Sequence, residues 1–398
     1  MDLTERINKL GIETAFLVGE ECKAFHDKNG FSFPFHLGDV DLLPPEELRI
    51  AGANAYLTSK TRYTPTLGIK ELREIVAKQF SERTKQEYTA ENVIILPGGK
   101  PAIAFFMQAF VNPGQEVLYP NPGYPIYESQ IRYAEGSPQP YPIVDTGSGF
   151  NIDLDNIEDL MTFNTRAIVL NNPHNPTGDI LEEKELKNLA KICVKRNIYV
   201  LDDRAYAGLV YEGSDLDMAS FPDMKEKTVT LGTLSKVYAV PGMRIGYAIG
   251  PTEAIEAFKK LATNIHSCPA TPGQLAGLAA MRGCSNDALK IKELLRRRRD
   301  LTVKLLNKIP GFRAYRPKGA FYAFPRVDEA MEQTRIRDLE EFRRKVSQDT
   351  GVFFCTRNHF GTPDASETAN YARFSFSGIN ETEIERGLSK LADYMSKK

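Results

Sequence analysis

The region from Asn92 to Gly250 constrains the fold most strongly, because short apolar runs alternate there with amphipathic stretches. A repeated order of apolar strand and amphipathic helix predicts a mostly parallel sheet that is covered by helices. Ligands of such sheets bind at the carboxyl ends of the strands, so polar residues that follow the apolar runs are candidates for a site. The apolar runs are residues 93–96, 116–119, 167–170, 198–201 and 229–231.

The chain has 398 residues, which is more than a single core usually holds, so two domains are expected. After about residue 285 the pattern changes to a long charged helix and then to short strands and further helices. We predict an α/β fold with a sheet of the seven-stranded type in a large domain, residues 45–285. Both ends of the chain, residues 1–44 and 286–398, are predicted to form a smaller α+β domain.

Charge and cysteine content exclude several classes of function. Lysine and arginine together number 51 and aspartate and glutamate 52, so the net charge of -1 offers no field that would attract nucleic acid. The five cysteines are odd in number and lack metal-site spacing, which argues against a disulfide framework or a metal centre. The N-terminus does not resemble a signal peptide, and no apolar run approaches the roughly 20 residues of a membrane helix. We therefore expect a cytoplasmic protein that binds neither nucleic acid nor membranes.

Lys236 lies on a tight connection between two apolar runs, residues 228–231 and 245–249. Desolvation lowers the pKa of a lysine, and a neutral amine can attack a carbonyl to form a Schiff base. Thr233 and Ser235 supply hydroxyl groups, and Arg244 supplies a permanently charged fork that suits a phosphate. The segment indicates a lysine imine to a phosphorylated aldehyde. For Lys236 alone, a strand-end lysine that reaches solvent is the alternative interpretation.

Gly98 and Gly99 follow a predicted strand and open a helical stretch, with Pro101 in the first turn. Backbone N–H groups at such a helix start bind anions without any side chain, which suits a phosphate. A Gly-Gly turn alone is weak evidence, because most such turns only begin a helix. Its value lies in the combination with Arg244 and the two hydroxyl groups.

Asp203 ends another predicted strand, where a buried carboxylate needs a cationic partner to stay charged. A protonated pyridine nitrogen is such a partner, and the ion pair keeps the ring able to accept electrons from a carbanion. Asp202 is the alternative, but Asp203 has Tyr206 three residues later, whose hydroxyl could reach the phenolic oxygen of the same ring. Asn175, in a proline-rich loop, could donate to that oxygen. Tyr124, held between prolines, offers a ring for stacking, with packing as its alternative role.

Together these segments resemble the class I/II aminotransferase family of fold-type I pyridoxal-phosphate enzymes, which are aspartate aminotransferase-like. The resemblance covers residues 36–376. It rests jointly on the Ser-Lys motif at 235–236, the Asn-Pro-His-Asn-Pro-Thr-Gly motif at 172–178 and the Arg-Phe-Ser motif at 373–375. Each motif is a hypothesis that structural context must confirm.

The resemblance implies a role for each matching residue. Lys236 resembles the lysine that forms the internal aldimine with pyridoxal 5'-phosphate, Asp203 the partner of the pyridine nitrogen, and Tyr206 a further catalytic residue. Arg373 resembles the arginine that grips the substrate α-carboxylate, a task that suits a planar bidentate donor. The implied substrate-binding residues are Gly38, Asn175 and Arg373. The implied cofactor-binding residues are Gly99, Lys100, Tyr124, Asn175, Asp203, Tyr206, Thr233, Ser235, Lys236, Arg244 and Tyr63.

The implied reaction is ping-pong transamination, in which an L-amino acid gives its amino group to a 2-oxo acid. Tyr63 resembles a tyrosine that is donated to the phosphate of the neighbouring subunit, which implies a homodimer with shared active sites. A C–S β-lyase of the same fold is the alternative, because it uses the same lysine and cofactor. A non-catalytic regulator that binds pyridoxal phosphate is a remote alternative, since the roughly forty residues before Gly38 carry no basic cluster.

The motifs do not assign a residue to the distal end of the substrate. In one branch of the family an arginine reads the second carboxylate, but residues 261–271 contain none. Lys100 resembles the lysine of a second branch that contacts acidic substrates, and a cation in a first helical turn opposes the helix dipole. Glutamate and 2-oxoglutarate are therefore candidate substrates, with a solvated Lys100 as the alternative. Thr233 departs from the usual serine or glycine but keeps the hydroxyl.

Overall fold

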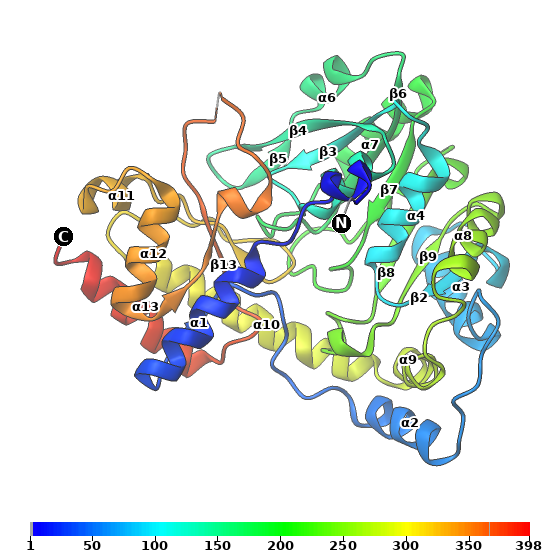
Figure 1. Cartoon of the computed structure of the whole chain (residues 1–398), viewed down its shortest axis with the longest axis horizontal. Helices are drawn as coiled ribbons and strands as arrows, with labels where there is room; N and C mark the ends of the chain where they lie inside the picture. The colour runs from blue at the N-terminus through cyan, green and yellow to red at the C-terminus, as the bar shows by residue number, and fades with distance from the viewer. Residues whose placement is uncertain (1–2, 366) are drawn as a thin grey trace.

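The computed structural model describes residues 3–365 and 367–398, and a single large sheet lies at its centre (Figure 1). The sheet has eight strands in the order β2-β9-β8-β7-β6-β3-β4-β5. Their bounds are β2 (Val93–Leu96), β3 (Glu116–Asn121), β4 (Ser137–Asp145), β5 (Phe150–Ile152), β6 (Thr165–Asn171), β7 (Tyr199–Asp203), β8 (Thr228–Thr233) and β9 (Gly246–Ile249).

Most of the sheet is parallel, which confirms the α/β fold expected from the alternating pattern. The strands β8, β7, β6, β3 and β4 are parallel neighbours, whereas β9 runs antiparallel to β2 and β8. The eighth strand, β5, pairs antiparallel with the end of β4 at the sheet edge. The seven-stranded expectation missed it because β5 has three residues and follows a tight turn, in which Gly147 has a φ of 82°.

The strands are buried on both faces, since successive residues point to opposite sides. Ile94 and Leu96 pack with α4 (Lys100–Phe110), α5 (Ile126–Tyr133) and α8 (Thr252–Ile265). Val93 and Ile95 pack on the other face, with α3 (Lys70–Thr84) and α9 (Thr271–Gly283). Farther along this second face lie α6 (Leu154–Leu160) and α7 (Glu183–Arg196). Such burial explains why the strands read as continuous apolar runs.

Helix α7 illustrates how the sequence places the site, because it returns the chain to β7. Its buried residues follow the spacing of one helix face: Leu186, Leu189, Ala190 and Cys193. Acidic residues in its first turn and basic residues in its last turn complement the helix dipole. The helix ends at Asn197, whose φ of 57° is left-handed, and β7 then runs to Asp203.

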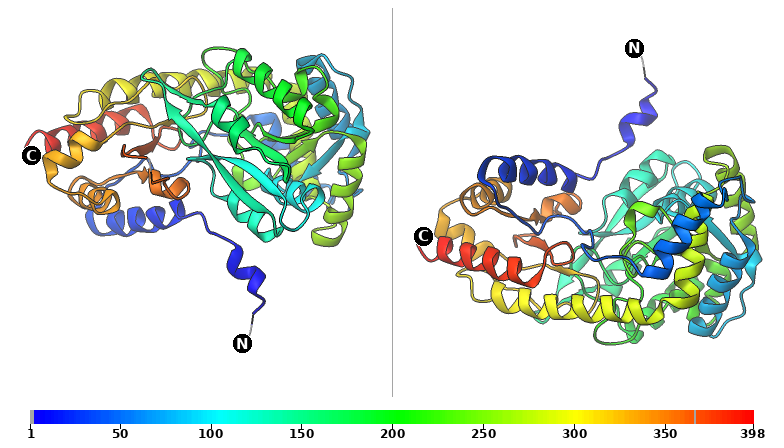
Figure 2. Two further views of the ribbon diagram at one scale, coloured as in Figure 1. Left: turned by 90° about the horizontal axis from the view of Figure 1, so that it is seen from above. Right: turned by 90° about the horizontal axis from the view of Figure 1, so that it is seen from below.

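Both ends of the chain pack together beside the sheet layers (Figures 1 and 2). Phe33 and Phe35 share a core with Leu295, Phe342 and Phe374. The short strands β1 (Phe33–Pro34) and β11 (Val352–Phe353) pair in parallel, while β10 (Tyr322–Ala323), β13 (Ala372–Ser375) and β12 (Cys355–Thr356) form an antiparallel sheet. The helices here are α1 (Ala15–Asn29), α10 (Ser285–Leu306), α11 (Asp328–Thr334), α12 (Leu339–Thr350) and α13 (Glu381–Met395). The division into residues 45–285 and residues 1–44 with 286–398 stays a prediction.

Two further elements lie near the N-terminus. The 3-10 helix η1 (Glu5–Lys9) projects beyond the body of the molecule (Figure 2). The backbone N–H of Gly11 donates to Ser129 Oγ at 2.9 Å, which ties this segment to α5. Helix α2 (Glu46–Leu57) packs on α9. Within residues 3–365 and 367–398, no helix is both long enough and apolar enough to cross a membrane.

Candidate active site

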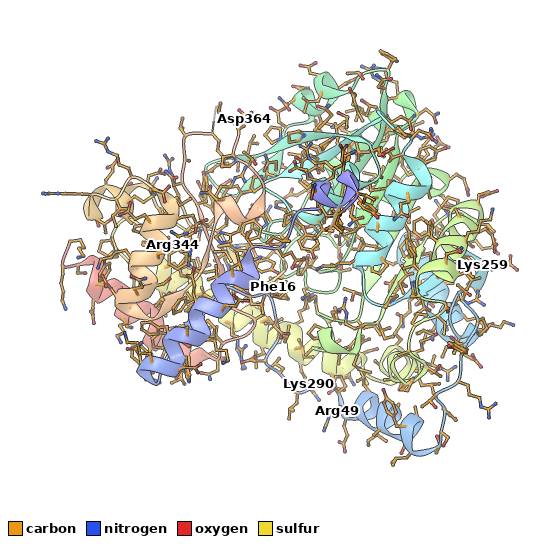
Figure 3. All side chains as sticks on the ribbon, viewed as in Figure 1. Phe16, Arg49, Lys259, Lys290, Arg344 and Asp364 are labelled. Carbon is orange, nitrogen blue, oxygen red and sulfur yellow. The ribbon has the colours of Figure 1, made fainter. Side chains whose placement is uncertain are left out.

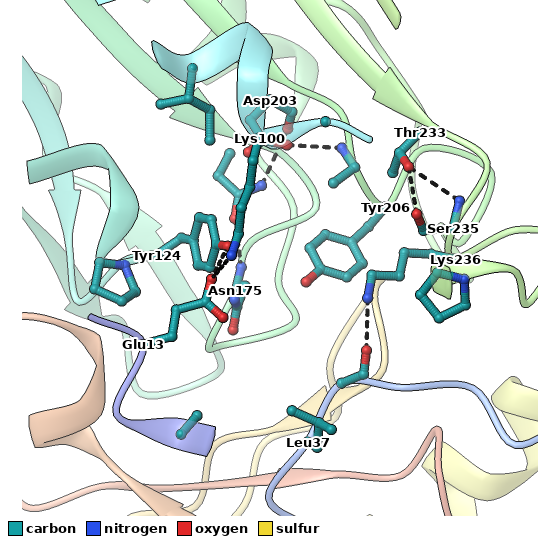
Figure 4. Close-up of a pocket in the computed structure, with 18 of the residues that line it drawn as sticks. Glu13, Leu37, Lys100, Tyr124, Asn175, Asp203, Tyr206, Thr233, Ser235 and Lys236 are labelled. Carbon is teal, nitrogen blue, oxygen red and sulfur yellow. Dashed lines mark hydrogen bonds and ion pairs between the residues drawn. The ribbon is translucent and has the colours of Figure 1, made fainter. Parts of the chain in front are cut away.

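A cavity of about 510 Å³ opens at the carboxyl ends of the parallel strands, between the sheet and the packed chain ends (Figure 4). Strand ends supply part of its wall, as expected for an open α/β sheet. The connections and helix starts that follow the strands, together with segments near both chain termini, supply the rest. Of the predicted site residues, twelve line this cavity: Gly38, Gly99, Lys100, Tyr124, Asn175, Asp203, Tyr206, Thr233, Ser235, Lys236, Arg244 and Arg373. Tyr63 is not in the wall, and 90% of it is exposed on the surface.

Lys236 follows β8 and points into the cavity (Figure 4). Its Nζ donates to the backbone carbonyl of Gly38 at 2.7 Å. Burial lowers the pKa of Lys236 to about 8, and the nearby carboxylate of Asp39 opposes part of that shift. A lysine with this pKa carries a usable fraction of neutral amine near neutral pH, which is what attack on an aldehyde requires.

Asp203 ends β7 with its carboxylate buried at the cavity wall. The Tyr127 hydroxyl donates to Oδ2 at 2.6 Å, and the Ala205 N–H donates to Oδ1 at 2.9 Å. Burial raises the pKa of Asp203 to about 6, although these hydrogen bonds oppose the shift. Among the described residues Asp203 makes no ion pair within 4.0 Å, so a cation supplied by a bound group would satisfy it.

The neighbouring Asp202 points away from the cavity, because successive strand residues face opposite sides of the sheet. It accepts from the backbone N–H of Met218 at 2.8 Å, and burial raises its pKa to about 7. It does not line the cavity. The structure therefore brings Asp203, and not the alternative Asp202, to the predicted place.

A group of anion-binding residues, called the anion recess below, lies where α4 begins. The helix starts after Gly99 without a side-chain cap, so its first N–H groups remain available at the cavity wall. The hydroxyl groups of Thr233 and Ser235 lie 2.8 Å apart beside it. Gly98 has a φ of 90°, and a Cβ there would stand 2.3 Å from Arg244 Nη2. Only glycine at position 98 lets Arg244 approach this turn, and the cation, hydroxyls and N–H groups together suit an anion.

Arg373, on β13, lies buried at the opposite wall. Its Nη1 donates to Asn175 Oδ1 at 2.9 Å, and its Nη2 donates to the His36 carbonyl at 2.5 Å. The guanidinium also lies over the Tyr322 ring, 4.4 Å from its centroid. Its Nε is buried without a hydrogen-bond partner among the described residues. A carboxylate could satisfy that unpaired donor.

In the close-up Tyr206 lies beside Lys236, and Asn175 lies near Tyr124 and Glu13 (Figure 4). The Tyr206 hydroxyl lies 2.8 Å from the Tyr322 hydroxyl, and burial raises the pKa of Tyr206 well above its ordinary value. Tyr206 therefore stays protonated and can donate. The Oδ1 of Asn175 is taken by Arg373, which leaves the amide N–H groups for another partner.

Lys100 and Tyr124 meet a residue that the motifs did not indicate, Glu13. Lys100 Nζ lies 2.6 Å from Glu13 Oε1, and the Tyr124 hydroxyl donates to the same oxygen. The Lys100 side chain is 48% exposed and paired with Glu13, so its role in substrate binding stays a prediction. Tyr127 and Tyr322 were also missed. For Tyr127 a signal existed, since it follows Tyr124 by three residues and lies in the first turn of α5.

These features of the site fit pyridoxal phosphate. The cavity holds a buried carboxylate without an ion-pair partner, an anion recess, and a lysine whose pKa is lowered. Comparison with known proteins agrees. A sequence model of the family described as aminotransferase class I and II matches residues 34–391. The chain belongs to this family. Members use pyridoxal phosphate, so this aminotransferase is a transaminase that depends on that cofactor.

Relatives of this aminotransferase cover nearly its whole length. A protein of Aquifex aeolicus named "Probable aspartate/prephenate aminotransferase" is 34% identical over 98% of this chain and 97% of its own. The aspartate aminotransferase of Bacillus subtilis is 30% identical over 92% and 93%. The structure of the Thermus thermophilus aspartate aminotransferase with maleate superposes with a TM-score of 0.91 at 28% identity and covers 99% of both chains. These relatives are transaminases, which favours transamination over C–S lysis or a purely regulatory role.

Across the part of the chain that the structure describes, no group of three or more histidine, cysteine, aspartate or glutamate side chains could hold a metal ion. All five cysteines are free. Cys355 is the one nearest the site, and its thiol contacts Arg373 Nη2 at 3.8 Å.

Proposed function

We propose that this transaminase moves the amino group between acidic L-amino acids and 2-oxo acids, with glutamate and 2-oxoglutarate as one pair. Lys236 is the proposed attachment point of the cofactor and the base of the reaction. The observation that carries the proposal is the placement of Lys236 Nζ, with a pKa lowered by burial to about 8, in one cavity with an anion recess and a buried Asp203.

The proposed cofactor-holding residues divide into three groups. The N–H groups of Gly99 and Lys100 with Thr233, Ser235 and Arg244 hold the phosphate. Asp203 holds the ring nitrogen in its protonated form, and Tyr127 keeps that carboxylate aimed into the cavity. Tyr206 and Asn175 donate to the phenolic oxygen, while Tyr124 offers its ring face. Once bound, pyridoxal phosphate supplies the electron sink that stabilises a carbanion at the substrate Cα.

The proposed work of the protein is to orient the substrate and to move one proton. Arg373 binds the α-carboxylate beside Gly38, and Tyr322 and Asn175 keep the guanidinium plane fixed. With the cofactor and substrate bound, Lys236 Nζ would be the group placed to take the proton from the substrate Cα and to give it back. Such general acid–base transfer contributes about 10²–10⁴ to the rate. Lys236 suits it because a pKa near 8 allows the amine to accept and release a proton at neutral pH.

The proposed preference for acidic substrates rests on Lys100, a cation of the cavity wall whose side chain is assigned neither to the α-carboxylate nor to the cofactor. Lys100 Nζ already binds a carboxylate, that of Glu13, at 2.6 Å. The residues 261–271, where another branch of the family would place an arginine, contain none. Lys100 is therefore our proposed reader of the distal carboxylate.

We also propose a homodimer in the cytoplasm, in which Tyr63 reaches the phosphate of the partner subunit. Tyr63 is 90% exposed, and the nearby Leu57 and Tyr56 at the end of α2 are exposed as well. Exposed apolar residues that cluster in this way favour an interface. The free cysteines favour a reducing compartment.

Two measurements test the proposed function. Reduction of the pyridoxal-phosphate enzyme with borohydride, followed by peptide mapping, should place the label on Lys236. A label on any other lysine would refute the assignment. A screen of amino acids, read from the cofactor absorbance, should convert the cofactor to its pyridoxamine form most efficiently with glutamate and aspartate. Efficient conversion by neutral amino acids alone would remove the acidic preference.

A further inference from the structure

The end of the cavity that lies across from Lys236 holds a carboxylate of the chain itself (Figure 4). Glu13 lies between η1 and α1 and extends its side chain toward α4 and α5. Its Oε1 is 2.6 Å from Lys100 Nζ, and the same oxygen accepts from the Tyr124 hydroxyl. Side-chain exposure is 16% for Glu13 and 48% for Lys100, so the pair is only partly shielded from water.

Both donors meet on one oxygen atom, which is the arrangement that an incoming carboxylate would need from the same two residues. Burial, and after it the charge of Glu13, raises the pKa of Tyr124 well above its ordinary value, so its hydroxyl remains a donor. Lys100 and Tyr124 therefore form a built carboxylate receptor, and Glu13 is its present occupant.

We propose that Glu13 occupies the place of the substrate's distal carboxylate, so that an acidic substrate binds by exchanging its own carboxylate for that of Glu13. A substrate with a short neutral side chain leaves the pair of Glu13 and Lys100 intact. Glu13 is in this way a specificity-determining residue: it sets how strongly the site favours dicarboxylic over monocarboxylic ligands. The inference deepens the proposed function and rests on Lys100 as the reader of that carboxylate.

Exchange is required because two carboxylates cannot share Lys100 at hydrogen-bond distance without strong repulsion. It is also inexpensive, since the ammonium group keeps an anionic partner before and after. Leaving a partly buried charge unpaired would cost far more than replacing one partner with another.

The segment that carries Glu13 is free enough to withdraw. Gly11 is tied to α5 through one hydrogen bond to Ser129 Oγ, at 2.9 Å. Ile12 is 69% exposed, and Phe16 at the start of α1 is 53% exposed and lies at the molecular surface (Figure 3). Glu13 lies outside every strand, so movement of this segment breaks no hydrogen bond of the sheet.

The test is equilibrium binding of maleate to the pyridoxal-phosphate enzyme, measured by titration calorimetry, with propionate as the monocarboxylate comparison. Glu13→Gln keeps the size of the side chain and removes its charge. We expect it to tighten maleate about 5- to 10-fold and to change propionate less than about twofold, within the range of ordinary coupling between ligands. Glu20→Gln is the matched control, because Glu20 is exposed on α1 and its loss should change neither affinity.

Two further variants separate the possible outcomes. Glu13→Ala removes both oxygens and must also tighten maleate, which excludes an effect of the new amide. Lys100→Gln must weaken the binding of maleate. If it does not, Lys100 does not bind the distal carboxylate, and both the proposed preference and this inference are wrong. If Lys100→Gln weakens maleate while Glu13→Gln and Glu13→Ala leave it unchanged or weaker, Lys100 keeps its role and the exchange is refuted.

Discussion

The two ends of the active-site cavity are built in different ways. At the cofactor end, Asp203 and Thr233 are the last residues of β7 and β8, and Gly99 precedes α4 directly. At the distal end, Glu13 lies in a stretch with neither helix nor strand, and it meets Lys100 across the cavity.

This difference separates the groups that hold the cofactor from the groups that discriminate between substrates. Ladder hydrogen bonds and burial on both sheet faces fix the strand ends, so the groups that hold the cofactor cannot drift. The N-terminal segment has few anchors and can move at small cost. The cofactor end, with Asp203, Thr233 and Gly99, is the rigid end and serves the chemistry that every substrate shares. The distal end, with Glu13, is the adjustable end and discriminates between substrates.

The largest effect is expected from Lys236→Ala, which acts at the cofactor end of the cavity. We expect turnover to fall about 10²- to 10⁴-fold, because the proton-transfer group is lost. The anion recess is untouched, so affinity for pyridoxal phosphate, read from absorbance titration, should change less than about tenfold. Lys260→Ala, on the exposed surface of α8, is the control. A Lys236→Ala enzyme with near-normal turnover would contradict the assignment.

Arg373→Lys removes the bidentate fork but keeps the charge. Loss of one hydrogen bond between charged groups should lower kcat/KM roughly 10- to 100-fold. The loss should be equal for alanine and glutamate, because both present the same α-carboxylate. Steady-state kinetics with the two donors checks this, with Arg49→Lys on exposed α2 as the control. A loss confined to glutamate would place Arg373 at the distal end instead.

The pH dependence of cofactor capture, the binding of pyridoxal phosphate by the apo-protein, tests the pKa of Lys236 without any mutation. Burial lowers the pKa of Lys236 to about 8, while Asp39 and Glu13 raise it and Arg373 and Arg244 lower it. The neutral amine is the reactive form, so its fraction grows as the pH rises through 8. The capture rate of the apo-protein, followed by stopped-flow absorbance, should rise about tenfold between pH 7 and pH 9. A rate that is flat across this range would mean that the lysine titrates elsewhere.

The smallest expected effect comes from Ser129→Ala at the adjustable end. This change removes the hydroxyl that accepts from the Gly11 N–H, which is worth about 0.5–1.5 kcal/mol. Limited proteolysis within residues 3–14 should become a few-fold faster, while cofactor affinity stays the same. Ser148→Ala, on an exposed turn, serves as the control. Weaker cofactor binding in Ser129→Ala would mean that the two ends are not independent.

The same contrast explains what the sequence could predict. Lys236, Asp203 and Arg244 were identified because each stands beside a strand-like run, and local pattern is enough to place a strand end. The choice between Asp203 and Asp202 depended on the nearby Tyr206. The structure gives the physical reason, since neighbouring strand residues face opposite sides and only Asp203 lines the cavity.

Glu13 and Tyr322 were missed because their position in the site comes from long-range packing. Glu13 precedes α1 and reaches Lys100 only once the N-terminal segment lies against α5. Tyr322 belongs to a two-residue strand whose partner, β13, follows about fifty residues later. No local pattern records such pairings. Tyr63 stays a prediction, since its role requires a second subunit.

The anchoring of Arg373 has a consequence for the whole enzyme. Its two terminal nitrogens are fastened to Asn175, after β6, and to the carbonyl of His36, near the start of the chain. The orientation of the guanidinium thus depends on the relative position of two segments that lie 139 positions apart in sequence. A small displacement of one segment relative to the other would rotate the guanidinium plane. A packing defect far from the site would therefore weaken the binding of every amino acid before it unfolds the protein.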